Sequence, residues 1–92
     1  MFVIVSYDVP DDRRRLKMAK LLLDYGGVRV QRSVFELYIE PRAFDRLHGR
    51  LVRLHVAEED SIRFYQLCES CRPKLQYLGQ AHPIDEPGLL II

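Results

Sequence analysis

The chain has 92 residues, of which 48% are hydrophobic and 29% are charged. This length corresponds to one domain with a modest core, and the composition excludes a disordered tail, a collagen-like chain and a coiled coil. No apolar run reaches the ~20 residues of a membrane helix, so we expect no membrane association. No basic segment precedes the apolar first residues and two cysteines are too few for a secreted disulfide framework, so we expect a cytoplasmic protein.

The net charge of +1 is unevenly distributed. Residues 1–57 carry a net charge of +4, whereas residues 58–92 carry −3. Eleven of the fourteen basic residues are arginines, whose planar guanidinium suits phosphate and carboxylate groups. This distribution permits nucleic-acid binding without requiring it.

The first half of the chain predicts a strand followed by a helix. Residues 2–7 form a nearly continuous apolar run rich in β-branched side chains, which is typical of a central strand buried on both faces. Residues 13–25 have apolar side chains at helical spacing, namely Leu16, Ala19, Leu22 and Leu23. Asp11 or Asp12 is expected to cap this helix, and Gly26-Gly27 to end it.

The following segments predict two more strands, a second helix and a last strand. Residues 28–40 are long enough for two strands that meet near residues 32–33, although one bent strand also fits. Residues 41–55 begin with proline and carry an apolar helical face. The alternation in residues 61–67 predicts a strand, and a further short strand is expected at residues 75–78.

The predicted fold class is α+β, a ferredoxin-like β-α-β-β-α-β sandwich with a C-terminal strand or tail extension. Its antiparallel sheet carries both helices on one face, so the other face meets water or a partner. Residues 1–79 are expected to form the domain and residues 80–92 the tail. The tail ends in Leu-Leu-Ile-Ile at residues 89–92. Such apolar residues are expected to be buried. They could pack on their own subunit, and packing on a dimer partner fits at least equally well.

Asp8 is the candidate catalytic residue. It ends the first predicted strand, where the positive end of the next helix favours an anion. Asp8 could cap that helix, but Asp11 and Asp12 are better placed to do so. One carboxylate per chain is few for a metal site, yet Mg²⁺ takes only one or two protein carboxylates and keeps several waters. A two-fold dimer axis could bring two copies of Asp8 together.

Basic residues gather at the start of the first predicted helix. Such residues oppose the helix dipole, and a phosphate backbone would favour them there. A solvated face neutralised by neighbouring carboxylates is the alternative. The group consists of Arg13, Arg14, Arg15, Lys17 and Lys20.

Two other basic groups differ in what they indicate. Arg29 and Arg32 lie on the predicted strands, where paired guanidiniums are unusual. The second predicted helix carries a stripe that is typical of a solvated face, namely Arg42, Arg46, Arg50 and Arg53.

Cys68 and Cys71 form half of a zinc ribbon, but the sequence has no second pair. A thioredoxin-type site needs the pair at a helix N-terminus, whereas this pair follows a predicted strand. We therefore interpret the two cysteines as structural. Ser33 has no evident His or Asp partner and is interpreted as a residue that hydrogen-bonds the backbone.

Four segments form a combined pattern: YDVPDD at residues 7–12, QRSVFE at 31–36, DSIR at 60–63 and YQLC at 65–68. Across residues 2–79 the chain resembles the small CRISPR-associated nuclease family, the ferredoxin-like partner of the CRISPR spacer-acquisition integrase. The resemblance implies a homodimer in antiviral defence, in which Asp8 pairs with its copy and binds Mg²⁺. It implies a metal-dependent endonuclease acting on RNA or double-stranded DNA.

The alternative implied by the resemblance is a non-catalytic dimeric DNA-binding scaffold of the integration complex. A small regulatory ferredoxin-like protein is a third hypothesis, which the clustered arginines disfavour. The expected nucleic-acid-binding residues are Arg13, Arg14, Arg15, Lys17, Arg29 and Arg32, and the expected cleft-shaping residues are Tyr7, Ser33 and Phe35.

Overall fold

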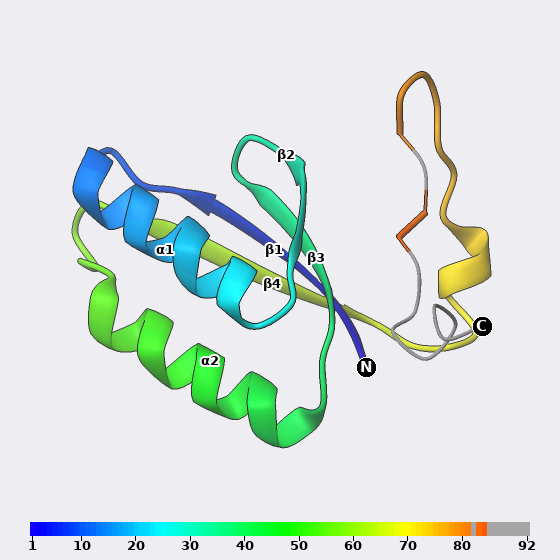
Figure 1. Ribbon diagram of the computed structural model, residues 1–92, viewed down its shortest axis with the longest axis horizontal. Coiled ribbons are helices and arrows are strands. Elements are labelled where there is room, and N and C mark those ends of the chain that lie inside the picture. The colour runs from blue at the N-terminus through cyan, green and yellow to red at the C-terminus, as the bar shows by residue number, and fades with distance from the viewer. Residues whose placement is uncertain (82, 85–92) are drawn as a thin grey trace.

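The computed structural model describes residues 1–81, 83 and 84. Its elements occur in the predicted β-α-β-β-α-β order (Figure 1). They are β1 (Phe2–Asp8), α1 (Asp12–Asp24), β2 (Val28–Gln31), β3 (Val34–Tyr38), α2 (Pro41–Leu54), β4 (Ser61–Leu67) and the short 3₁₀ helix η1 (Arg72–Lys74).

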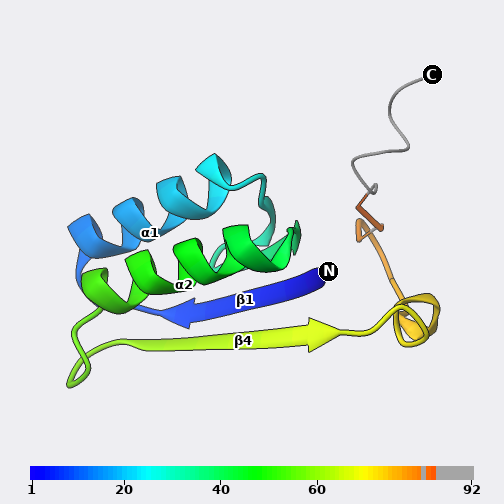
Figure 2. The same ribbon diagram turned by 90° about the horizontal axis from the view of Figure 1, so that it is seen from below.

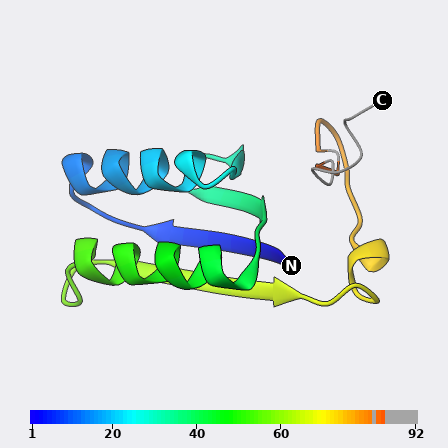
Figure 3. The same ribbon diagram turned by 60° about the horizontal axis from the view of Figure 1, so that its bottom comes forward.

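The four strands form one antiparallel sheet in the order β2-β3-β1-β4. The first strand is therefore central, as predicted. Both helices cover the same face of the sheet, and the opposite face carries none of them (Figure 2, Figure 3). This arrangement confirms the predicted α+β ferredoxin-like fold. We call the face without helices the open face.

The pleat of β1 divides its side chains between the two faces. Val3, Val5 and Tyr7 point toward the helices and join the buried core. Residues between them point to the open face, because successive side chains of a strand alternate. Asp8 follows Tyr7 in the strand and therefore lies on the open face. The helices and β3 supply the rest of the core, mainly Met18, Ala19, Leu22, Phe35, Leu37, Leu47 and Leu51.

Helix α1 has the capping residue and the terminating glycines that the sequence predicted. Asp11 is the cap, since its carboxylate accepts the backbone N–H of Arg14 at 2.9 Å. Gly26 has a φ of 86°, a conformation that favours glycine. A Cβ atom on Gly27 would lie 2.7 Å from the carbonyl oxygen of Leu22. The turn into β2 therefore requires this pair of glycines.

The apolar face of α1 differs in part from the predicted spacing. Ala19 and Leu22 are buried together with Met18, whereas Leu16 is 68% exposed and Leu23 is 52% exposed. The two helices of so small a sheet bury only a narrow stripe of α1. The outer leucines therefore lie beside the basic side chains on the surface.

The predicted strand at residues 75–78 is wrong, because these residues belong to no strand. A turn after β4 and the Pro73-containing helix η1 carry the chain beyond the end of the sheet (Figure 1). Leu75 and Tyr77 border a hollow together with residues of the edge strand β2, but residues 75–78 form no strand pairing with it. Residues 89–92, expected to pack on a partner, lie outside the described residues. Within the described part of the chain, no helix has the length and apolar character needed to cross a membrane.

Candidate functional site

Asp8 lies on the open face at the last position of β1. Its partner on β4 is Ser61, and the preceding open-face pair is Ser6 and Arg63. These residues border a shallow hollow of about 230 Å³, together with Tyr7 and Tyr65. The hollow therefore combines a carboxylate, two hydroxyls and a guanidinium on one side of the sheet.

The Asp8 side chain is exposed, and its carboxylate has no hydrogen bond or ion pair with the residues that the structure describes. The capping role falls to Asp11 instead. Asp12 pairs with Arg15, and Asp60 is bound by Arg14. Asp8 is thus left with both oxygens available to a ligand.

Arg15 fixes the loop that follows Asp8. Its Nη1 donates to the carbonyl oxygen of Val9 at 3.1 Å, and its Nη2 donates to Asp12. The side chain remains partly exposed. Arg15 is therefore a positioning residue for the β1–α1 loop.

The turn between β2 and β3 is attached to the same end of the sheet. The backbone N–H of Tyr7 donates to the carbonyl oxygen of Ser33 at 3.0 Å. Arg32 precedes Ser33 in this turn and is exposed. Arg13 and Lys17, at the start of α1, are also exposed. Asp8 is therefore flanked by two basic segments.

The aromatic rings expected to shape the cleft lie mainly in the core. Phe35 is fully buried, and its ring stacks on that of Tyr7 at a centroid distance of 6.3 Å. The guanidinium carbon of Arg29 lies 5.1 Å from the centroid of Phe35. The Tyr7 hydroxyl is buried without a partner among the described residues. These rings thus lie on the helix-covered face of the sheet, opposite to Asp8.

Arg14 is bound within the protein. Its Nε and Nη2 donate to the two carboxylate oxygens of Asp60 at 2.9 and 3.0 Å, and Nη2 also reaches Glu59 at 2.7 Å. The Asp60 side chain is completely buried and also accepts the backbone N–H of Val56 at 2.9 Å. The hydrogen bonds from Arg14 lower the pKa of Asp60, although burial opposes them. This network ties the start of α1 to the start of β4.

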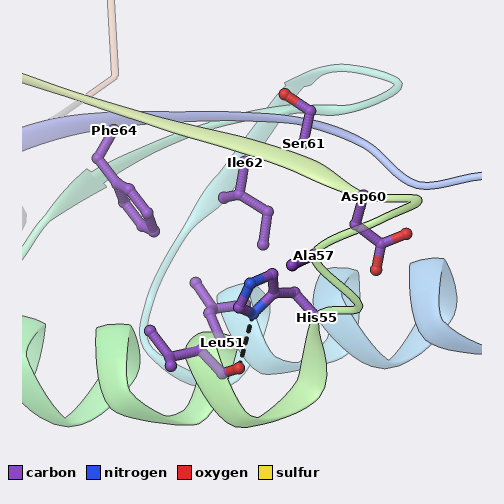
Figure 4. Close-up of a pocket in the computed structure, with 8 residues that line it drawn as sticks. Leu51, His55, Ala57, Asp60, Ser61, Ile62 and Phe64 are labelled. Atoms are coloured by element: carbon purple, nitrogen blue, oxygen red, sulfur yellow. Dashed lines mark hydrogen bonds between the residues drawn. The ribbon is translucent and has the colours of Figure 1, made fainter.

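A second hollow of about 320 Å³ lies between the end of α2 and the start of β4. Figure 4 shows Leu51, His55, Ile62 and Phe64 facing it, whereas the Asp60 carboxylate turns toward α1. The His55 Nδ1 atom lies 2.6 Å from the carbonyl oxygen of Val52. The lining is mainly apolar and its carboxylate is already bound, so this hollow is a poorer candidate for phosphate chemistry.

The sequence did not predict four residues of the Asp8 hollow, namely Ser6, Ser61, Arg63 and Tyr65. The alternation of residues 61–67 places the last three on one face of a strand. Their position opposite the end of β1 depends on the register between two strands that are distant in sequence. That register comes from the structure.

The profile of the family described as CRISPR associated protein Cas2 matches residues 1–75. The chain belongs to this family. CRISPR-associated endoribonuclease Cas2 3 of Synechocystis sp. is 43% identical over 89 residues, covering 97% of this chain and 96% of that protein. The resemblance recognised from the sequence is thereby confirmed.

Two solved structures support the same conclusion. Cas2 of Streptococcus pyogenes has a TM-score of 0.74 and 39% identity, covering 86% of this chain and all of that chain. A chain of a structure described as a partial Cas6-RT-Cas1–Cas2 complex has a TM-score of 0.71 and 27% identity, covering 92% of this chain and 96% of that chain.

We predict that Arg14→Gln lowers the melting temperature by several degrees at pH 7, because Asp60 would remain buried without its cation. The pKa of Asp60 is lower in the folded than in the unfolded state, so the ion pair stabilises the fold at neutral pH. This stabilisation is lost as the pH falls through the folded-state pKa. The difference in melting temperature between the variant and the wild type should therefore shrink in acid.

The matched control is Arg13→Gln, which removes a neighbouring charge that has no partner among the described residues. Thermal unfolding followed by circular dichroism from pH 7 to acid measures both variants. Equal melting temperatures for the two variants, or a difference independent of pH, would contradict the structural role of Arg14.

Proposed function

We propose that the protein is a metal-dependent endonuclease of CRISPR spacer acquisition, and that Asp8 is its catalytic and metal-binding residue. The observation that carries this proposal is the unpaired Asp8 carboxylate beside Arg63 on the open face. The Synechocystis relative named as an endoribonuclease supports a nuclease activity. The proposed substrate is RNA or double-stranded DNA.

The donors around Asp8 fit Mg²⁺ held mainly by water and substrate. Asp8 offers two free oxygens, and the hydroxyls of Ser6 and Ser61 border the same hollow. Among the described residues, no group of three or more His, Cys, Asp or Glu side chains forms a metal cage. Mg²⁺ is commonly bound by one or two carboxylates together with waters and phosphate oxygens. A bound Mg²⁺ would neutralise phosphate charge and activate a water molecule.

The surrounding side chains have distinct roles in this proposal. Asp8 holds the cation, and the guanidinium of Arg63 binds the phosphate on the opposite side of the hollow. Arg15 keeps the loop after Asp8 in place through its bonds to Val9 and Asp12. Tyr7 and Phe35 give β1 a rigid support through their stacked rings.

We further propose that the active form is a homodimer in which two Asp8 residues serve one phosphodiester. The open face supports this proposal, because it presents Tyr65, which is 48% exposed, and the half-buried Ile4 and Leu67. The solved complex whose description contains Cas1–Cas2 supports an integrase subunit as a further partner. We also propose that the protein acts in the cytoplasm, where it would meet these partners and the nucleic acid.

The proposed nucleic-acid contacts come from the two basic segments that flank Asp8. Arg14 is left out of this set because its guanidinium is already bound by carboxylates. Arg15 contributes the part of its side chain that remains exposed. The other contacts are assigned to Arg13, Lys17, Arg29 and Arg32, all of which are exposed.

We predict that Asp8→Asn lowers Mg²⁺-dependent cleavage by several orders of magnitude, because the amide keeps the shape but loses the charge that binds the cation. Cleavage of single-stranded RNA and of duplex DNA should be measured with Mg²⁺ and with EDTA. Asp45→Asn is the matched control, since Asp45 is an exposed carboxylate on α2. It should cleave like the wild type.

Identically purified samples exclude a contaminating nuclease, whose activity would not follow the Asp8 variant. Equal cleavage by wild type and Asp8→Asn would show that Asp8 is not catalytic. Absence of metal-dependent cleavage in the wild type, with duplex binding intact, would favour the DNA-binding scaffold instead.

We also predict that duplex binding is mainly electrostatic, so that log affinity falls linearly with log salt. The slope should be about −0.9 per neutralised phosphate. Replacing Arg13, Lys17 and Arg32 together by Gln should make the slope shallower by about two to three units. Binding is measured by fluorescence anisotropy in EDTA on the Asp8→Asn background, so that no cleavage occurs.

The control for this prediction replaces Arg42 and Arg46 on α2, which are also exposed. The control variant keeps all the basic residues that are assigned to nucleic-acid binding. This variant should keep a slope near that of the parent. A binding constant that barely responds to salt, or an equal change of slope in both variants, would refute the assigned basic segments.

A further inference from the structure

The turn after β4 brings two cysteine side chains together. The Sγ atoms of Cys68 and Cys71 lie 3.1 Å apart, and both cysteines are free thiols. The backbone N–H of Cys71 donates to the carbonyl oxygen of Cys68 at 3.0 Å, which closes the turn. Cys68 is exposed and Cys71 is half-buried. A small reagent can therefore reach the pair, and a bond between the sulfurs needs only a small shift.

We propose that Cys68 and Cys71 form an oxidisable dithiol that closes to an intrachain disulfide on reaction with a small disulfide such as oxidised glutathione. This modification site uses none of the residues assigned to phosphodiester cleavage. It also differs from the structural role that the sequence alone suggested for the pair.

The surroundings give the two thiols different roles. Cys68 Sγ lies 3.1 Å from Ser70 Oγ, and the hydrogen bonds from Ser70 and Cys71 lower the pKa of Cys68 to about 7. The pKa of Cys71 is raised, mainly by its hydrogen bond to Cys68. A thiol with a pKa near the ambient pH is the best attacking group. Cys68 is therefore the attacking thiol, and Cys71 is the resolving thiol.

The reaction proceeds by two exchanges. The Cys68 thiolate attacks one sulfur of oxidised glutathione, forms a mixed disulfide and releases one glutathione thiolate. Cys71 then loses its proton to solvent, and its sulfur displaces the second glutathione from Cys68. Two electrons pass from the protein thiols to oxidised glutathione, which leaves as two reduced molecules that take up protons from solvent. The disulfide between Cys68 and Cys71 remains.

Formation of the disulfide would restrict the residues that follow it, because the same turn positions Arg72 on the open face. The backbone N–H of Arg72 donates to the carbonyl oxygen of Cys68 at 3.2 Å. Its guanidinium carbon lies 4.7 Å from the ring centroid of Phe2 and 4.5 Å from that of Tyr38. A disulfide restricts the turn that holds Arg72 over these rings. Oxidation therefore stabilises the start of the C-terminal segment against the sheet.

The test compares the full chain after exposure to oxidised glutathione and after reduction with dithiothreitol. Intact mass after alkylation with iodoacetamide should show a loss of two hydrogens and no alkyl groups in the oxidised protein. The reduced protein should carry two alkyl groups. Trypsin cleavage of the Lys74–Leu75 bond should be several-fold slower in the oxidised protein, because η1 opens less often.

Two single variants separate the roles of the thiols. Cys71→Ser should trap a mixed disulfide between Cys68 and glutathione, because the resolving thiol is missing. Cys68→Ser should react several-fold more slowly, because the remaining thiol of Cys71 is half-buried whereas that of Cys68 is exposed. Neither variant should show slower trypsin cleavage after oxidation. Two alkylated cysteines after oxidation, an intersubunit disulfide, or equal trapping by both variants would overturn the proposal.

Discussion

The alternation of side chains along β1 is the constraint on which the rest of the structure depends. The helices cover one face of the sheet, so Val3, Val5 and Tyr7 must enter the core. The pleat then places Asp8 on the open face, at the end of a strand held on both sides by other strands. The residues that stabilise the fold and the residue proposed for catalysis thus share one strand without competing for the same space.

The end of the sheet that carries Asp8 is held by two arginines with different partners. Arg14 joins α1 to the buried Asp60 before β4, which fixes the strand that supplies Ser61 and Arg63. Arg15 binds the loop between Asp8 and α1. The basic cluster is therefore partly structural and partly available for phosphate. The number of basic residues in the sequence does not show which of them are paired within the protein and which are available to bind phosphate.

The sequence was sufficient for the order of elements and for the position of Asp8 at the end of the first strand, because hydrophobic periodicity and turn residues are local signals. It was insufficient where partners are distant in sequence. The pairing of Arg14 with Asp60 and the place of Arg63 beside Asp8 depend on tertiary contacts. The prediction of a strand at residues 75–78 failed for a related reason, since an apolar pattern does not show whether a segment pairs with a strand that is distant in sequence.

Two Asp8 carboxylates are proposed to act together across a homodimer, and subunit mixing tests this cooperation most directly. Wild-type and Asp8→Asn chains are exchanged at a constant total concentration, with exchange verified by a mass tag, and metal-dependent cleavage is measured at each ratio. If one site needs both carboxylates, activity falls with the square of the wild-type fraction. A linear fall would contradict the account, because each subunit would then cleave with its own Asp8.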